Sequence, residues 1–224
     1  MIFKGHPEVK ALSFEVSSAR SHFTISSLDE SVAAVFKDLS PDEKYCTNFK
    51  VRVFALNSAG EKTAEVAFLT GTSLDAESAY AEEADGILML CDMISTDLCQ
   101  MAEAITDEAG NVKRTICPPE RCIMYIHNMY VEEAYRSAGL GRYLLDNVNE
   151  LFAQAFNYAH HVCVLRPYPQ VKSGDCALES KGDAAAEDVE RLIAFYKRVG
   201  YKLIGDSDYM YMIQKNAFEE SLDI

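Results

Sequence analysis

A short glycine-rich segment carries the most specific chemistry in this sequence. Residues 136–142 read Arg-Ser-Ala-Gly-Leu-Gly-Arg; they follow an apolar stretch and precede a helical pattern. The glycines allow the backbone to approach a ligand closely, and the start of a helix offers unpaired N–H groups and a positive dipole end. The segment is therefore predicted to bind a phosphate or pyrophosphate group.

Two better-known phosphate-binding loops do not fit this segment. No Lys-Ser or Lys-Thr pair follows it, as a nucleotide P-loop would require, and Leu144 stands where a dinucleotide-binding fold needs its third glycine. An R-x-x-G-x-G string alone could equally be a simple turn before a helix. The flanking elements therefore decide how it is interpreted.

Those flanking elements indicate a strand before the segment and a helix after it. Residues 121–131 are apolar on both alternating faces, which is typical of a central strand. After the segment, apolar residues recur at helical spacing: Leu144, Leu145, Val148, Leu151, Phe152, Ala155 and Phe156. The glycine-rich segment is thus predicted to join a buried strand to an amphipathic helix.

The remaining pattern predicts an α/β chain. Strands are expected at residues 12–16, 48–57, 64–70, 87–93, 162–165, 201–204 and 209–213, with a hairpin turn at residues 58–60. Helices are expected at residues 31–39, 98–105 and 189–199, the last ending at Gly200. Three parts are predicted: an appendage over residues 1–47, a main domain over 48–215 and an acidic tail over 216–224.

Two segments resemble signatures of the GNAT superfamily of acetyl-CoA-dependent N-acetyltransferases. Residues 131–141 are similar to V-x-P-x-x-R-x-x-G-x-G, with Glu133 in place of the frequent proline, and residues 194–201 are similar to F-Y-x-x-x-G-aromatic. The resemblance covers residues 48–214, in which 170–186 looks like an insertion. Arg166-Pro167-Tyr168-Pro169 stands where the family often has a cofactor-contacting asparagine.

The resemblance implies a fold, a cofactor and a reaction. The expected GNAT fold has a mixed central sheet of about six or seven strands flanked by helices, with parallel strands splayed at the cofactor cleft. An amine would attack acetyl-CoA directly, with no acyl-enzyme and no metal. The implied cofactor-binding residues are Met129, Tyr130, Val131, Arg136, Ser137, Ala138, Gly139, Leu140, Gly141 and Arg142.

Four side chains are candidates for catalysis. Amine attack requires loss of a proton, and a histidine can accept one near neutral pH, so His127 on the central strand is the first candidate for the base. A packed core histidine is an equally good interpretation, and Glu132 or Glu133 are alternatives. Tyr196 matches the family tyrosine that protonates the departing CoA thiolate, although it can also simply pack in the helical stripe.

Composition limits the other functions. With 21 basic and 35 acidic residues, the net charge of −14 argues against nucleic-acid binding. The sequence has seven cysteines but no C-x-x-C pair, and it has no long apolar segment, so we expect a cytoplasmic protein with no membrane span. We also expect a monomer or a homodimer. The acceptor is an unspecified small-molecule or peptide amine. A catalytically inactive acyl-CoA sensor of the same fold is an alternative interpretation of the whole chain. Residues 1–47 are expected to act either as a lid over the acceptor site or as a partner-binding segment.

Overall fold

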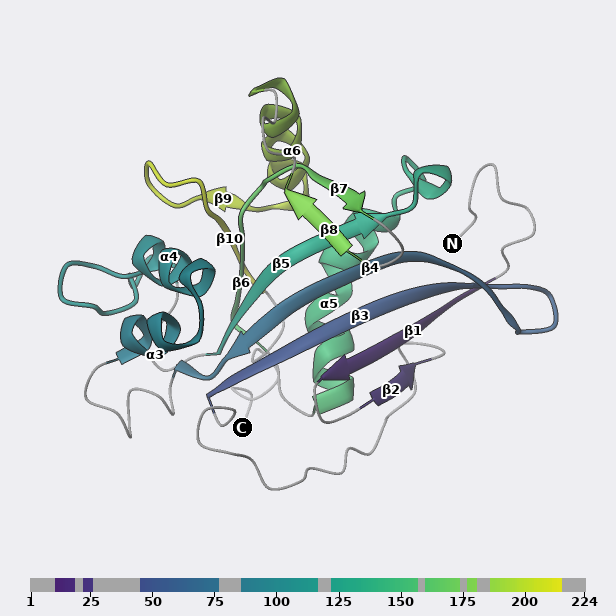
Figure 1. Cartoon of the computed structure of the whole chain (residues 1–224), viewed down its shortest axis with the longest axis horizontal. Coiled ribbons are helices and arrows are strands. Elements are labelled where there is room, and N and C mark those ends of the chain that lie inside the picture. Colours follow the sequence, from purple (N-terminus) through teal and green to yellow (C-terminus); the bar gives the residue numbers. More distant parts are fainter. Residues whose placement is uncertain are drawn as a thin grey trace, which may run out of the picture. The chain divides into compact units, whose positions relative to one another are not determined.

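The computed structural model describes residues 11–18, 22–25, 45–76, 86–116, 122–156, 160–173, 177–180 and 186–214 (Figure 1). The chain divides into two compact units. Unit 1 comprises Met1–Leu39, Thr47–Gly71 and His127–Ala159, and unit 2 comprises Ser40–Cys46, Thr72–Ile126 and His160–Ile224.

The described strands form an eight-stranded sheet in the order β2-β1-β3-β4-β5-β6-β10-β9 and a separate β7-β8 hairpin. The sheet is mixed, because β1 pairs antiparallel with β3 whereas β5 pairs parallel with β6. This arrangement confirms the predicted α/β class and is consistent with a GNAT fold. The strands of the main sheet are β1 Ala11–Ser18, β2 His22–Ile25, β3 Cys46–Leu56, β4 Lys62–Leu74, β5 Ile123–Val131, β6 Val162–Leu165, β9 Lys202–Leu203 and β10 Met210–Ile213.

In unit 1, the N-terminal residues supply part of the sheet. β1 pairs with β3 from Ala11 opposite Leu56 to Ser18 opposite Phe49, and β2 pairs with β1 on its other side. Strand β2 lies at the edge of the sheet and brings the strand count to eight. The predicted helix over residues 31–39 lies outside the described residues, as does the predicted tail.

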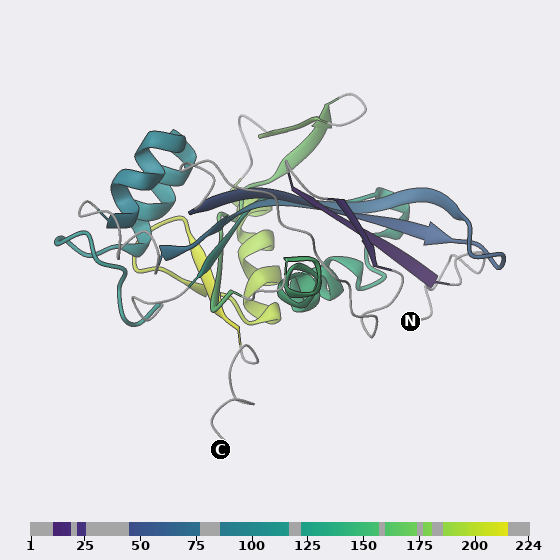
Figure 2. The ribbon, with the colours of Figure 1, turned by 90° about the horizontal axis from the view of Figure 1, so that it is seen from below.

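Helix α5, Leu140–Phe156, lies against one face of the unit 1 strands (Figure 2). The ring of Phe49 on β3 meets Phe152 edge-on at 5.0 Å between centroids, and Phe14 on β1 stacks with Tyr143 at 6.0 Å. The predicted helical stripe is confirmed by complete burial of six of its residues: Leu144, Leu145, Val148, Leu151, Phe152 and Ala155. The helix begins at Leu140, within the glycine-rich segment, and its buried stripe packs on the strands.

The predicted hairpin between β3 and β4 is confirmed. The side-chain oxygen of Asn57 accepts hydrogen bonds from the N–H groups of Ala59 and Glu61, at 2.9 and 3.0 Å. Gly60 adopts a φ of +79°, which residues with a Cβ rarely reach. Asparagine and glycine thus close the turn at the positions where the sequence predicts it.

Unit 2 contains one correction to the sequence-based prediction. Residues 87–93 were expected to form a strand, but they belong to helix α3, Gly86–Ile94, followed by α4, Thr96–Ile105. The two completely buried residues of α3, Ile87 and Cys91, are four apart and so share one helix face. The residues between them, Leu88, Met89 and Leu90, are not β-branched and favour a helix, and a short apolar run does not by itself distinguish a helix from a strand.

The rest of unit 2 follows the prediction more closely. Helix α6, Ala186–Val199, ends at Gly200, whose φ is +119° and whose N–H donates to the Tyr196 carbonyl at 3.1 Å. The expected insertion contains the hairpin of β7, Gln170–Ser173, and β8, Ala177–Ser180. Of the helices in the described ranges, none is long and apolar enough to cross a membrane.

Candidate active site

The glycine-rich segment forms a tight turn that ends at the first turn of α5. A short 3-10 helix, Glu133–Tyr135, precedes it, and Ser137 and Gly139 both adopt left-handed backbone conformations, with φ values of +63° and +85°. The N–H of Tyr143 donates to the Gly139 carbonyl at 2.9 Å. The N–H groups of residues 140–142 therefore precede the helical hydrogen-bond ladder and are in position to meet an anion.

Space is open in front of this turn. A Cβ placed on Gly139 would have no atom of another part of the chain within 4 Å. The next side chain, Leu140, is only 1% exposed and anchors the turn in the core. Leu140 thus anchors the turn in the core, while the space next to Gly139 is open, which fits the close approach of a pyrophosphate.

Arg136 ties this turn to the end of β5. Its Nε donates to the Val131 carbonyl at 3.0 Å, and its guanidinium lies 5.4 Å from the ring centroid of Tyr130. One terminal nitrogen lies 3.5 Å from a carboxylate oxygen of Glu133. These contacts give Arg136 a positioning role.

The second half of β5 differs from the first half. Residues 123–126 are at most 3% exposed, whereas residues 127–131 are half-buried. The register of β5 with β6 is described from Ile123 opposite Val162 to Ile126 opposite Leu165, and β5 continues beyond it to Val131. The prediction of a strand covered on both sides therefore holds for the first half only, and Met129, Tyr130 and Val131 lie in the less covered half.

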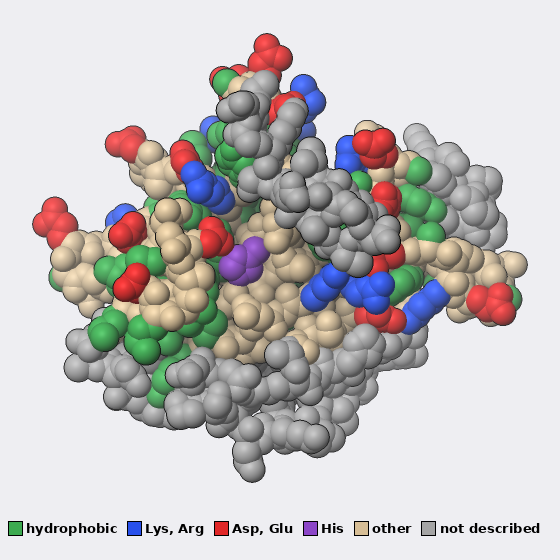
Figure 3. Space-filling view, viewed as in Figure 1, with side chains coloured by type: hydrophobic (Ala, Val, Ile, Leu, Met, Phe, Trp, Pro, Cys, Tyr) green, Lys and Arg blue, Asp and Glu red, His purple; other side chains and the backbone are tan. Residues whose placement is uncertain are grey.

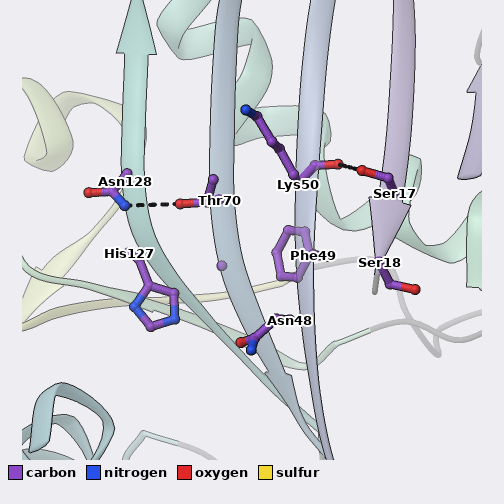
Figure 4. Close-up of a pocket in the computed structure, with 9 residues that line it drawn as sticks. Ser17, Ser18, Asn48, Phe49, Lys50, Thr70, His127 and Asn128 are labelled. Atoms are coloured by element: carbon purple, nitrogen blue, oxygen red, sulfur yellow. Dashed lines mark hydrogen bonds between the residues drawn. The ribbon is translucent and has the colours of Figure 1, made fainter. Parts of the chain in front are cut away.

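His127 lines a pocket of about 410 Å³ on the unit 1 sheet (Figure 4). The pocket is formed by β1, β3, β4 and β5, and its residues are Ser17, Ser18, Asn48, Phe49, Lys50, Thr70, Gly71, His127 and Asn128. His127 and Asn128 both line it although they are adjacent in β5, where side chains of a regular strand would point to opposite faces. Asn128 donates from its side-chain nitrogen to the Thr70 hydroxyl at 3.0 Å, which joins β5 to β4 within the pocket.

Sequence reasoning did not identify Lys50, Thr70 or Asn128 as site residues. Each is one of several polar residues in its strand, so the sequence offers no signal that singles it out. The two alternative bases lie at the end of β5: the Glu133 side chain is 83% exposed beside Arg136, and the Glu132 N–H donates to the Val66 carbonyl at 2.9 Å.

Tyr196 lies in unit 2, in the last turn of α6, and is 8% exposed. Its ring meets Phe195 and Tyr201 edge-on, at centroid distances of 5.2 and 5.7 Å. Burial raises the pKa of Tyr196 to about 12, so its hydroxyl keeps its proton at neutral pH.

Arg166 occupies the position where the resemblance leads one to expect an asparagine. It forms an ion pair with Asp208 at 2.9 Å, and its guanidinium lies 5.8 Å from the ring centroids of Tyr168 and Tyr209. The residue is thus engaged in contacts within unit 2. Across the described part of the chain, no group of three His, Cys, Asp or Glu residues is arranged to hold a metal ion.

Comparison with solved structures gives a distant likeness. No family model matches the sequence, and no curated protein matches it. The crystal structure of Arabidopsis thaliana NAA60 in complex with a bisubstrate analogue is 16% identical, with 72% of this chain and 71% of that chain covered and a TM-score of 0.33. A likeness at this level carries no argument, so the functional interpretation depends on the residues and geometry described above.

Proposed function

We propose that this chain is an N-acetyltransferase of the GNAT type, which transfers an acetyl group from acetyl-CoA to an amine. The observation that carries the proposal is the open turn at Gly139, placed between β5 and the first turn of α5. Two sequence segments in the order typical of the superfamily support it.

In this proposal, the N–H groups of residues 137–142 hold the pyrophosphate of acetyl-CoA. The backbone of residues 129–131 aligns the pantetheine arm in the manner of an added strand and polarises the thioester carbonyl. Arg136 supports both parts, because it joins the turn to the Val131 carbonyl.

The chemical step is a direct transfer. The amine nitrogen bonds to the acetyl carbon as the carbon–sulfur bond breaks. His127 accepts a proton from the nitrogen, directly or through water, and Tyr196 donates a proton to the leaving sulfur. Burial raises the pKa of Tyr196, so its hydroxyl carries a proton at neutral pH that it can donate. A cytoplasmic location stays a prediction from the sequence.

A pair of matched glycine variants tests the cofactor site. Gly139→Glu places bulk and negative charge where the pyrophosphate would lie, and calorimetry should show acetyl-CoA affinity weakened by about 100-fold or more, which is about 2.7 kcal/mol. Gly110→Glu is the control, because Gly110 has a φ of +79° and equally open surroundings at a turn in unit 2, outside the glycine-rich segment. Equal affinity of the two variants would overturn the assignment of the turn.

Turnover needs a separate assay. Free thiol released from acetyl-CoA is measured while the protein is given a panel of amines. Release that depends on both protein and amine supports the transferase. Tight acetyl-CoA binding without release from any amine would instead indicate an acyl-CoA sensor.

A further inference from the structure

The pocket that contains His127 has an uneven distribution of charge. Its lining includes three hydroxyl side chains, Ser17, Ser18 and Thr70, and two amides, Asn48 and Asn128. Lys50 is the charged residue of the lining, and no carboxylate belongs to it among the residues that the structure describes. A polyamine or other cationic substrate would find no opposite charge there.

Other cations on the same strands are already neutralised. Arg52 on β3 lies 3.5 Å from a carboxylate oxygen of Glu15 and forms a shorter ion pair with Glu65, and Lys62 on β4 pairs with Glu15. Figure 3 shows basic and acidic side chains close together on the face seen in that view. Among the described residues, each of these two cations therefore has a carboxylate partner.

Lys50 differs from these two residues. Within the described ranges, no carboxylate lies within ion-pair distance of its ammonium group, which instead lies 4.9 Å from the ring centroid of Phe68. Phe68 in turn stacks on Tyr130 at 5.7 Å, the same ring that Arg136 covers. An aromatic face holds a cation in place without neutralising it, so the charge stays available to an anionic ligand.

The overall charge of the chain does not cancel this local charge. The net charge of −14 acts over long distances, but physiological salt screens exposed charges beyond roughly 8 Å. Contacts inside the pocket therefore decide which ligand binds there.

We propose that the acceptor of this enzyme is an amine that also carries a carboxylate, with the carboxylate paired to Lys50 and the amine directed toward His127. The inference rests on the proposed acetyl transfer and narrows its substrate class to amino acids and related amino carboxylates. The hydroxyl and amide groups of the pocket are suited to hydrogen bonds with the same ligand.

Matched acceptor pairs test this proposal. Thiol release from acetyl-CoA is measured with a panel of α-amino acids, each offered as the free acid and as its carboxamide, and with spermidine as a cationic comparison. We expect the free acids to give a kcat/KM about 10- to 100-fold above that of their carboxamides, because a charge-assisted contact is stronger than a neutral one.

Variants connect that preference to Lys50. Lys50→Gln should reduce the acid-to-carboxamide ratio at least about 10-fold, and Lys50→Arg should restore much of it. Lys202→Gln is the control for loss of one positive charge, because Lys202 is an exposed residue of β9 outside the pocket. Comparison of this ratio between the wild type and each variant cancels the difference in basicity between the two amines, because that difference is the same for every protein.

The outcomes separate this inference from the proposed function. If carboxamides or spermidine give thiol release at least equal to that with free acids, the carboxylate assignment is overturned. An unchanged acid-to-carboxamide ratio in Lys50→Gln would also overturn it. Neither result would contradict the proposed acetyl transfer. No release with any amine would overturn both.

Discussion

Arg136 donates a hydrogen bond of 3.0 Å from Nε to the carbonyl oxygen of Val131. The contact joins the first residue of the glycine-rich segment to the last residue of β5. The arginine of the R-x-x-G-x-G pattern therefore acts within the protein, where it holds the turn in place relative to the strand.

Arg136→Ala should loosen the turn and weaken acetyl-CoA binding about 10-fold, or about 1.4 kcal/mol. Amide hydrogen exchange of residues 132–139 should become faster, with no change in the overall unfolding free energy beyond about 1 kcal/mol. Weaker binding with unchanged exchange would instead mean that Arg136 contacts the phosphates directly.

His127→Gln should lower the rate of thiol release by about 10²- to 10⁴-fold, which is the usual contribution of a general base. Acetyl-CoA affinity, measured by calorimetry, should stay the same because the change lies in the acceptor pocket. His161→Gln, outside that pocket, serves as the control. A wild-type rate in His127→Gln would leave Glu132 as the next candidate.

Tyr196→Phe should keep the ring packing against Phe195 and Tyr201 and remove only the hydroxyl. We expect kcat to fall about 10- to 100-fold with little change in acetyl-CoA affinity, because proton donation to the thiolate is lost. Tyr201→Phe tests the specificity of the effect. If kcat of Tyr196→Phe at saturating substrates equals that of the wild type, Tyr196 has no part in the reaction.

His160 should make the stability of the protein depend on pH. It is completely buried, with Nε2 2.8 Å from the Ser73 hydroxyl oxygen, and burial, assisted by the charge of His161, lowers its pKa from 6.5 to about 3. The unfolded chain therefore takes up a proton below about pH 6.5 that the folded chain does not. The free energy of unfolding is therefore unaffected by His160 above about pH 6.5, and it decreases as the pH falls from there toward 3.

The slope from this one residue should approach about 1.4 kcal/mol per pH unit in that range. Urea unfolding at a series of pH values measures it, and His160→Gln should remove that part of the slope while the contribution of carboxylates persists. Identical slopes in both proteins would show that His160 can be protonated in the folded state.

Local patterns in the sequence were sufficient to predict the turn at Gly139 and the helix that follows it. The apolar stripe of α5 repeats at helical spacing, and residue 139 is a glycine where the backbone turns, so both could be predicted without knowledge of the fold. The strand expected at residues 87–93 was wrong for the opposite reason. That apolar run is too short for its periodicity to separate a strand from a helix, and packing of Ile87 and Cys91 on one helix face decided the outcome.

The sequence by itself determined the α/β class, the turn at Gly139 and the helix that begins after it, because each depends on residues close together in the chain. Only the tertiary structure decided which side chains share the pocket that contains His127. Ser17, Lys50, Thr70 and His127 come from four strands, and their meeting depends on strand order and register. Those are set by contacts between distant residues, which no local pattern encodes.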